Sequence, residues 1–341
     1  MGLENLSARY QPDLNTVLIS TVGNTSLPMY AMIRYHMGWV DASGEPRAAK
    51  GGKLLRPALC LAACESVGGN WRSALPAAAA IEILHNFTLV HDDIEDGDRE
   101  RRGIPTIWAL WGEAQGINTG DAMHALARLA LLKLEETGYP PQKVIRAARM
   151  LDEACLRLCE GQYLDIAYES RTDIEVPDYL TMIERKTAAL FACSVEMGAF
   201  LGTDDEATIE ALGRFGRNLG LAFQVQDDIL GIWGHPETTG KSSATDIRKR
   251  KKTLPIVHAL RNASADLRND LIRLYSGHTI AEDDIPRILA ILKSVDAHRN
   301  AIETAERYIQ QALSELAKAP LDPSAKDRLA SLAESLLGRD R

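Results

Sequence analysis

Apolar residues recur at intervals of three and four along most of the chain, which is the spacing of one face of an α-helix. Ile83, Phe87 and Val90 form one such series, and another runs from Leu126 to Leu132. No stretch shows the sustained alternation of apolar and polar residues that is typical of a β-strand. The pattern predicts an all-α protein.

The predicted helices are separated by short segments rich in glycine, proline and small polar residues. These breaks are Asp41–Gly52, Thr137–Pro141, Ser170–Asp178, Gly202–Asp205, Trp233–Asp246, Ser276–Pro286 and Ala319–Ala325. None of them resembles a long flexible linker, and no repeat of solenoid length is found. We therefore expect residues 1–341 to form one multi-helix domain.

An aspartate-rich run, LVHDDIEDGDRERRG from Leu89 to Gly103, closes one of the helical series. Asp92 and Asp96 are four residues apart, about 40° from eclipsed on a helix, so their carboxylates face the same way. Asp93 points roughly 100° aside. Two carboxylates at the negative end of a helix dipole attract a cation, and Mg²⁺ suits such oxygen ligands best. A solvated acidic helix end is the alternative for a single run of this kind.

A second aspartate-rich run, FQVQDDILGIWG from Phe223 to Gly234, has a similar apolar lead-in. Its first aspartate, Asp227, comes 227 − 92 = 135 residues after the first aspartate of the earlier run. The repetition favours a metal site over a solvated surface. We expect the two runs to face each other across a central cavity of a helical bundle.

Cationic residues suited to phosphate binding accompany the first run. Lys53 and Arg56 follow two glycines whose backbone can approach an anion closely. His85 is seven residues before the first carboxylate of the run and about 20° from its helical face. Arg101 and Arg102 follow the run directly, where paired guanidinium groups suit a diphosphate. A capped helix start, a buried core histidine and surface arginines are the alternative interpretations.

A second polar group lies later in the chain. Lys186 and Thr187 are in the middle of a predicted helix, and Gln224 comes just before the second aspartate run. Lys241 and Lys251 belong to a basic, glycine-bearing segment after that run, and its position favours a polyphosphate ligand. Ordinary polar helix faces, a core hydrogen bond and a solvated loop are the alternatives.

Composition narrows the class of protein. Apolar residues make up 45% of the chain, enough for a large core, and a net charge of −8 argues against a nucleic acid partner. No apolar run approaches membrane-spanning length, and the amino terminus lacks a secretion signal. Cys60 and Cys64, like Cys155 and Cys159, are four apart, which predicts buried apolar positions in a reducing cytoplasm.

Taken in order, these motifs resemble those of the trans-isoprenyl diphosphate synthases, or polyprenyl synthetases. The resemblance runs from about Gly51 to Pro255 and joins GGKLLRP, DDIEDGDRERRG, GQYLDI, KTAALF, FQVQDDILG and GKSSATDIRKRKKTLP. It implies an all-α bundle around a deep cavity, usually as a homodimer. It also implies an Mg²⁺-dependent prenyltransferase that condenses isopentenyl diphosphate with an allylic diphosphate, head to tail, through ionisation, condensation and proton elimination.

The resemblance assigns a role to each candidate residue. The diphosphate of isopentenyl diphosphate would be held by Lys53, Arg56, His85 and Arg102. The allylic diphosphate, carrying a dimethylallyl, geranyl or farnesyl group, would contact Arg101, Lys186, Lys241 and Lys251. Two or three Mg²⁺ ions would be bound with that diphosphate by Asp92, Asp96 and Asp227. Thr187 and Gln224 would flank the developing cation, and the catalytic set would be Asp92, Asp96, Arg101, Lys186 and Asp227.

One position departs from the family pattern. The second motif is usually DDxxD, but Gly231 stands in place of the last aspartate. We therefore expect a weaker metal site on this side. We also expect Gly231→Asp to lower the Mg²⁺ requirement, provided that the helix continues so far.

Product length is predicted from the residues that lead into the first run. Phe87 and Thr88 are five and four residues before Asp92, and an aromatic residue at the earlier place alone resembles geranylgeranyl diphosphate synthases. We expect the twenty-carbon product, with farnesyl diphosphate as the alternative. Helix geometry turns Phe87 roughly 140° from Asp92, so its role as cavity floor rests on the resemblance.

Two rival classes fit the motifs less well. A class I terpene cyclase needs no second diphosphate pocket, and NDLIRLYSG from Asn269 has no serine at the place that a cyclase's second metal motif requires. A non-catalytic subunit of a heteromeric synthase would be expected to lose carboxylates of the first motif. Asp92, Asp93 and Asp96 are all present.

Overall fold

The computed structural model describes residues 3–47, 52–234, 244–277 and 279–337. It divides into two compact units whose segments alternate along the sequence. Unit 1 consists of Met1–Glu153, Cys193–Leu212 and Pro320–Arg328. Unit 2 consists of Ala154–Ala192, Gly213–Ala319 and Leu329–Arg341.

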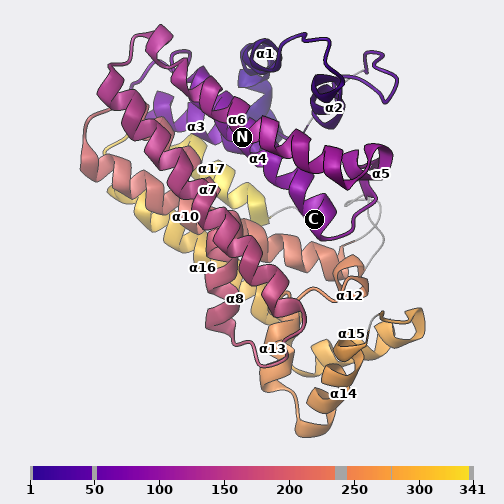
Figure 1. Cartoon of the computed structure of the whole chain (residues 1–341). Coiled ribbons are helices and arrows are strands. Elements are labelled where there is room, and N and C mark those ends of the chain that lie inside the picture. Colours follow the sequence, from indigo (N-terminus) through magenta and orange to yellow (C-terminus); the bar gives the residue numbers. More distant parts are fainter. Residues whose placement is uncertain (1–2, 48–51, 235–243, 278, 338–341) are drawn as a thin grey trace. The chain divides into compact units, whose positions relative to one another are not determined.

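Unit 1 is built mainly from the amino-terminal helices (Figure 1). They are α1 (Leu3–Val22), α2 (Pro28–His36), α3 (Leu55–Ser66), α4 (Leu75–Glu95), α5 (Ile107–Trp111), α6 (Glu113–Leu132), the 3₁₀ turn η1 (Glu135–Thr137) and the first half of α7 (Pro141–Glu169). Between α4 and α5, strands β1 (Glu100–Arg101) and β2 (Ile104–Pro105) form a small antiparallel hairpin.

Helix α4 is the centre of unit 1, because it packs along α6 and also contacts α1, α3 and α5. Its side chains from Leu75 to Leu84 are buried. Glycine on α6 brings the two helices close together, since a Cβ on Gly120 would lie 2.2 Å from His91 Nε2 on α4. The carboxyl end of α4, which carries the first aspartate run, is therefore held on a rigid helix.

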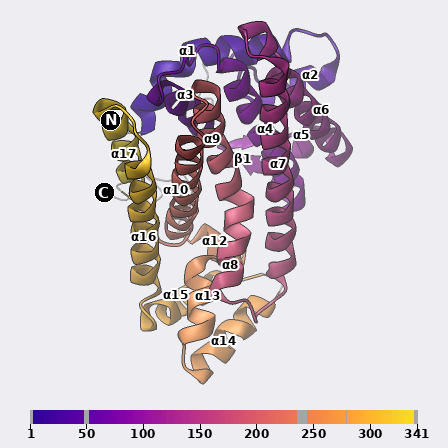
Figure 2. The same cartoon turned by 90° about the vertical axis from the view of Figure 1, so that its left-hand side faces the viewer.

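Unit 2 contains the helices that follow (Figure 2). They are α8 (Val176–Ile183), the π-helical turn η2 (Glu184–Ala188), α12 (Thr245–Arg248), α13 (Leu254–Asn262), α14 (Ala265–Ser276), the 3₁₀ turn η3 (Glu282–Asp284), α15 (Ile285–Ser294) and α16 (Ala297–Lys318). Helices α7, α9 (Ala189–Gly202), α10 (Glu206–Trp233) and α17 (Pro323–Leu337) contribute residues to both units. Helix α13 packs against α8, α14, α15 and α16.

The predicted all-α class is confirmed, and the described residues add only the β1–β2 hairpin and an isolated bridge. Within the described residues, no helix is both long and apolar enough to cross a bilayer. Cys60, Cys64 and Cys155 are buried as predicted. The prediction is wrong for Cys159, which is exposed because it lies on the outer face of α7.

Candidate active site

The first aspartate run lies at the carboxyl end of α4. The helix ends at Glu95, and the Asp96 N–H donates to the Asp92 carbonyl oxygen at 2.8 Å, which places these two residues one helical turn apart. Both are partly exposed, whereas Asp93 is only 2% exposed. The predicted division between two outward carboxylates and one turned aside is therefore confirmed.

The β1–β2 hairpin brings Arg101 back onto this helix end. Its Nε donates to Asp93 Oδ1 at 2.6 Å and its Nη2 to Asp92 Oδ2 at 3.1 Å. The two turn residues, Arg102 (φ 55°) and Gly103 (φ 73°), are both left-handed, as a tight hairpin turn requires. Burial raises the pKa of Asp93 to about 6, against the opposing effect of Arg101. Asp93 thus anchors the arginine, which also contacts the partly exposed Asp92.

The cationic residues of unit 1 lie around α4 and the start of α3. Arg56 Nη1 is 3.2 Å from His85 Nε2, so these two residues, both expected to hold one diphosphate, are in contact. Burial, with the charges of Arg56 and Arg102, holds the pKa of His85 well below its ordinary value. The imidazole is therefore neutral. Lys53 is exposed and precedes Leu54, which has a left-handed backbone (φ 48°) at the start of α3.

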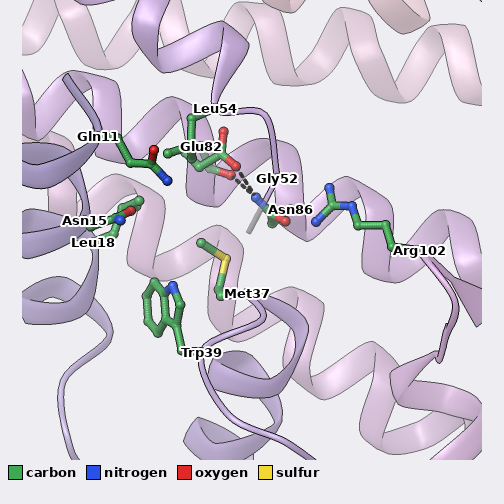
Figure 3. Close-up of a pocket in the computed structure, with 10 residues that line it drawn as sticks. All are labelled: Gln11, Asn15, Leu18, Met37, Trp39, Gly52, Leu54, Glu82, Asn86 and Arg102. Atoms are coloured by element: carbon green, nitrogen blue, oxygen red, sulfur yellow. Dashed lines mark hydrogen bonds between the residues drawn. The ribbon is translucent and has the colours of Figure 1, made fainter. Parts of the chain in front are cut away.

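A pocket of unit 1 adjoins these residues (Figure 3). Arg102 points into it from one side, and a Cβ on Gly52 would lie 3.1 Å from Arg102 Nη2. Glu82, 4% exposed, accepts a hydrogen bond from Asn86 Nδ2 at 2.8 Å. Burial raises the pKa of Glu82, while Asn86, Arg56 and Arg102 favour its charged form. Glu82 is thus a buried counter-charge that the motif analysis missed, because it belongs to no charged run.

The residues predicted to set product length occupy different sides of α4. The Phe87 ring is buried, with its centroid 5.1 Å from that of His91 and 5.0 Å from that of His124 on α6. Thr88 is partly exposed, and its hydroxyl donates to the His85 carbonyl oxygen at 2.7 Å. Thr88 therefore shares the open face of the helix with Asp92, and Phe87 does not.

In unit 2, a π-helical turn carries Lys186 and Thr187. Lys186 Nζ is 2.5 Å from Asp165 Oδ2 on α7. The glycine of the GQYLDI motif lets α7 and the π-helical turn come this close, because a Cβ on Gly161 would lie 2.1 Å from the Lys186 backbone nitrogen. Single π-helical turns are frequent at functional sites. The sequence predicted a plain helix here, and its spacing indicated neither the π-helical turn nor the contact with Asp165.

A buried hydrogen-bond network joins Thr187 to the second aspartate run. The Thr187 hydroxyl donates to Gln224 Oε1 at 2.6 Å, and Gln224 Nε2 donates to Asp228 Oδ1 at 3.1 Å. Asp228 Oδ2 accepts from the Tyr179 hydroxyl at 2.5 Å and from the Leu254 N–H at 2.8 Å. Burial raises the pKa of Asp228 to about 7. The network holds the Thr187 and Gln224 side chains in place.

The two aspartates of the second run differ in exposure, because Asp227 is exposed on α10 and its neighbour is buried. Helix α10 continues to Trp233, so the helical condition set for position 231 is met. The space beside it is occupied, since a Cβ on Gly231 would lie 2.0 Å from Asp246 Oδ2. The Lys251 N–H donates to the Asp246 carbonyl oxygen at 2.9 Å. Lys241 lies outside the described residues.

Comparison with known proteins decides the family. Residues 38–292 match the family model described as polyprenyl synthetase. The chain belongs to this family. A geranylgeranyl diphosphate synthase of Mycobacterium tuberculosis is 41% identical over 320 residues, which are 93% of this chain and 90% of that protein. A (2E,6E)-farnesyl diphosphate synthase of Mycobacterium bovis is 40% identical over 314 residues, 91% of this chain and 86% of that protein.

The fold agrees with this membership. The crystal structure of a polyprenyl synthetase from Streptomyces coelicolor A3(2) matches with a TM-score of 0.91 and 37% identity, covering 97% of this chain and 98% of that one. The likeness confirms the all-α isoprenoid synthase fold. The family and the two curated relatives make this polyprenyl synthetase a trans-prenyltransferase, as the motifs predicted.

Proposed function

We propose that this polyprenyl synthetase is an Mg²⁺-dependent enzyme that condenses isopentenyl diphosphate with allylic diphosphates and releases geranylgeranyl diphosphate. The observation that carries the proposal is the carboxylate pair Asp92 and Asp96 at the end of α4, with Arg101 beside it and the Arg56–His85 contact in the same unit. Such a set offers oxygen ligands to a metal and separate cations to diphosphate groups.

The residues of the two motifs fit Mg²⁺ bound together with a diphosphate. Among the described residues, no three His, Cys, Asp or Glu side chains gather as a ready metal cluster. Asp92 and Asp96 are partly exposed oxygen donors one turn apart, and Asp227 is exposed on α10. Mg²⁺ usually takes one or two carboxylates, several waters and the oxygens of a substrate phosphate. When bound, the ion would neutralise charge on the leaving diphosphate.

The remaining side chains supply the other requirements of the reaction. Lys186 and Arg101 would stabilise the pyrophosphate that leaves when the allylic C–O bond breaks. The Thr187 and Gln224 dipoles would face the allylic cation without capturing it. The double bond of isopentenyl diphosphate then forms the new C–C bond, and a proton passes to the released pyrophosphate. Arg56 and the neutral His85 would hold the diphosphate of isopentenyl diphosphate meanwhile.

The choice of a twenty-carbon product rests on Phe87 and Thr88. The two curated relatives are named for different products at nearly equal identity, so they favour neither. Thr88 leaves the open face of α4 unobstructed by an aromatic ring, while Phe87 is wedged between His91 and His124. This arrangement supports growth beyond fifteen carbons, with farnesyl diphosphate as the alternative product.

We further propose that the enzyme is a single-domain homodimer of the cytoplasm. Exposed apolar side chains at Leu156 and Tyr163 support the dimer. They are seven residues apart, about 20° from eclipsed on a helix, and therefore lie on one stripe of α7. A second copy of the chain is the partner that would cover it. Leu156→Glu should shift the mass measured by analytical ultracentrifugation from dimer to monomer.

The decisive experiment incubates the purified chain with isopentenyl diphosphate and each of dimethylallyl, geranyl and farnesyl diphosphate, with and without Mg²⁺. Asp92→Ala should lower the condensation rate by several orders of magnitude and leave the circular dichroism spectrum unchanged. Asp121→Ala, an exposed aspartate on α6, is the control. A folded wild-type chain that makes no prenyl product with any primer would exclude the proposal. A hydrocarbon formed from one allylic substrate alone would favour a cyclase.

A further inference from the structure

The described part of the basic segment after α10, residues 244–254, runs into the interior of unit 2 and is not a solvated loop. Lys252, Thr253 and Leu254 are 5%, 4% and 1% exposed. Lys251, which directly precedes them, is partly exposed. Two neighbouring lysines therefore differ in their surroundings, because one side chain is accessible to a ligand and the other is packed among protein atoms.

The ammonium group of Lys252 joins two helices of unit 2. Its Nζ donates to the backbone carbonyl oxygen of Glu169 at 2.8 Å, and Glu169 is the last residue of α7. The last carbonyl groups of a helix have no partner within it and carry the negative end of its dipole, so they favour a cation. The same Nζ is 5.0 Å from the centroid of the Tyr275 ring on α14, within the range of a cation–π contact. Lys252 thus clasps the segment to α7 and α14.

Tyr275 makes this contact through its ring and not through its hydroxyl group. The side chain is 2% exposed, and its hydroxyl group forms no hydrogen bond with any described residue. Burial lowers the pKa of Lys252 to about 8, with Arg250 acting in the same direction and Glu169 against it. The charged form of Lys252 therefore prevails at neutral pH, where it can use both the carbonyl group and the ring.

The backbone just before Lys252 depends on such an anchor. Ala244 (φ 58°) and Arg250 (φ 54°) both have left-handed conformations. These conformations are costly for residues other than glycine, and they persist where the surrounding structure enforces them. Between them, the Lys251 N–H donates to the Asp246 carbonyl oxygen at 2.9 Å, which closes the segment into a turn. The direction of the Lys251 side chain is therefore set by how firmly this turn is held.

We propose that Lys252 is a positioning residue, whose clasp on α7 and Tyr275 directs the side chain of Lys251 towards the diphosphate of the allylic substrate. The inference rests on the proposed function, because it takes Lys251 to contact that diphosphate. Helix α7 also holds Lys186 through Asp165, one turn before the helix end that Lys252 caps. The two lysines expected to contact the allylic diphosphate are thus tied to the same end of one helix, which fixes the spacing of their charges.

Steady-state kinetics with geranyl diphosphate and isopentenyl diphosphate test this role. Lys252→Met keeps the length of the side chain and removes its charge and its hydrogen-bond donor. We expect the Michaelis constant for geranyl diphosphate to rise about tenfold and that for isopentenyl diphosphate to change less than about twofold. Lys252→Arg retains a charged donor and should recover most of the loss. Lys293→Met, which changes an exposed lysine on α15, should behave like wild type.

Two further comparisons separate positioning from a loss of stability. If Lys252 acts through Lys251, then Lys252→Met should add little to the defect of Lys251→Met, whereas independent effects would multiply. Tyr275 gives a second route that applies even if Lys252→Met does not fold. Tyr275→Leu removes the ring and should raise the Michaelis constant for geranyl diphosphate, while Tyr275→Phe keeps the ring and should leave it unchanged.

Several results would overturn the inference. They are an unchanged Michaelis constant for geranyl diphosphate in folded Lys252→Met, equal rises for the two substrates, multiplied defects in the double variant, or equal behaviour of the two Tyr275 variants. Wild type makes prenyl product in each of these cases, so the proposed function stands. A folded wild-type chain that makes no prenyl product would instead overturn the proposed function, and the inference with it.

Discussion

Asp227 and Asp228 are neighbours of the same type in one motif, yet their substitution should have opposite consequences. Asp228 is 4% exposed within an apolar cluster that includes Val225, Ile229 and Leu254. Asp228→Ala removes the acceptor of three hydrogen bonds. Asp227→Ala removes an exposed carboxylate from the same helix. We expect the first change to destabilise the protein and the second to abolish activity in a stable protein.

The magnitude follows from the donors that Asp228→Ala leaves behind. The Tyr179 hydroxyl and the Leu254 N–H, both on residues 1% exposed, would lose their acceptor. A buried unsatisfied donor costs about 1–3 kcal/mol, so the two together cost about 2–6 kcal/mol. The desolvation cost of the buried carboxyl group, which the Ala variant does not bear, offsets part of this. We expect a net loss of about 2–4 kcal/mol in free energy of unfolding near pH 6, where folded Asp228 is mostly protonated.

The sign of the pH dependence follows from the raised pKa. The pKa of Asp228 is about 7 in the folded protein, against an ordinary value of 3.8 that applies to the unfolded chain. Between these two pH values the carboxyl group is therefore protonated in the folded state and ionised in the unfolded state. Its contribution to stability is therefore greatest at low pH and is lost as pH rises towards 7. The cost of Asp228→Ala should shrink by roughly 1.4 kcal/mol between pH 6 and 8. Asp228→Asn cannot ionise at this position, so the stability of that variant should lack this pH dependence.

Urea denaturation followed by circular dichroism, at both pH values and without metal or substrate, measures these differences. Asp227→Ala should stay within about 0.5 kcal/mol of wild type, as exposed substitutions usually do, while losing condensation activity. Equal denaturation midpoints for Asp227→Ala and Asp228→Ala would refute the reasoning, because they would show that the buried network contributes nothing.

Three further outcomes are expected. Arg56→Ala removes a charged hydrogen bond of about 1.5–3 kcal/mol, so steady-state kinetics should show a higher Michaelis constant for isopentenyl diphosphate. A larger rise for the allylic substrate would mean that the two pockets are assigned backwards. Because the pKa of His85 is far below its usual range, binding of isopentenyl diphosphate should show no inflection between about pH 6 and 8 from this ring, and His85→Gln should leave that profile unchanged. Phe87→Ala should lengthen the products seen by chromatography and Thr88→Phe should shorten them, whereas identical profiles would place the floor of the product tunnel elsewhere.

Much of the chemistry was readable from the chain because it depends on local geometry. The three- and four-residue apolar period predicts helices, and a spacing of four puts Asp92 and Asp96 one turn apart on any α-helix. The position of Asp93 to one side follows from the same rule. The order of the motifs along the chain was enough to indicate the family, because each motif carries residues suited to one step, such as metal binding or diphosphate binding.

Only the tertiary structure determines which of two neighbouring aspartates is buried and which is exposed. Local spacing does not distinguish Asp227 from Asp228, which only the resemblance separated, because the exposed face of α10 depends on how α8 and α13 pack against it. Asp246, fifteen residues later, lies against Gly231 because the backbone folds back on the helix. Helical periodicity determines the direction of a side chain relative to its own helix. Contacts between distant segments depend on packing, which no local spacing encodes.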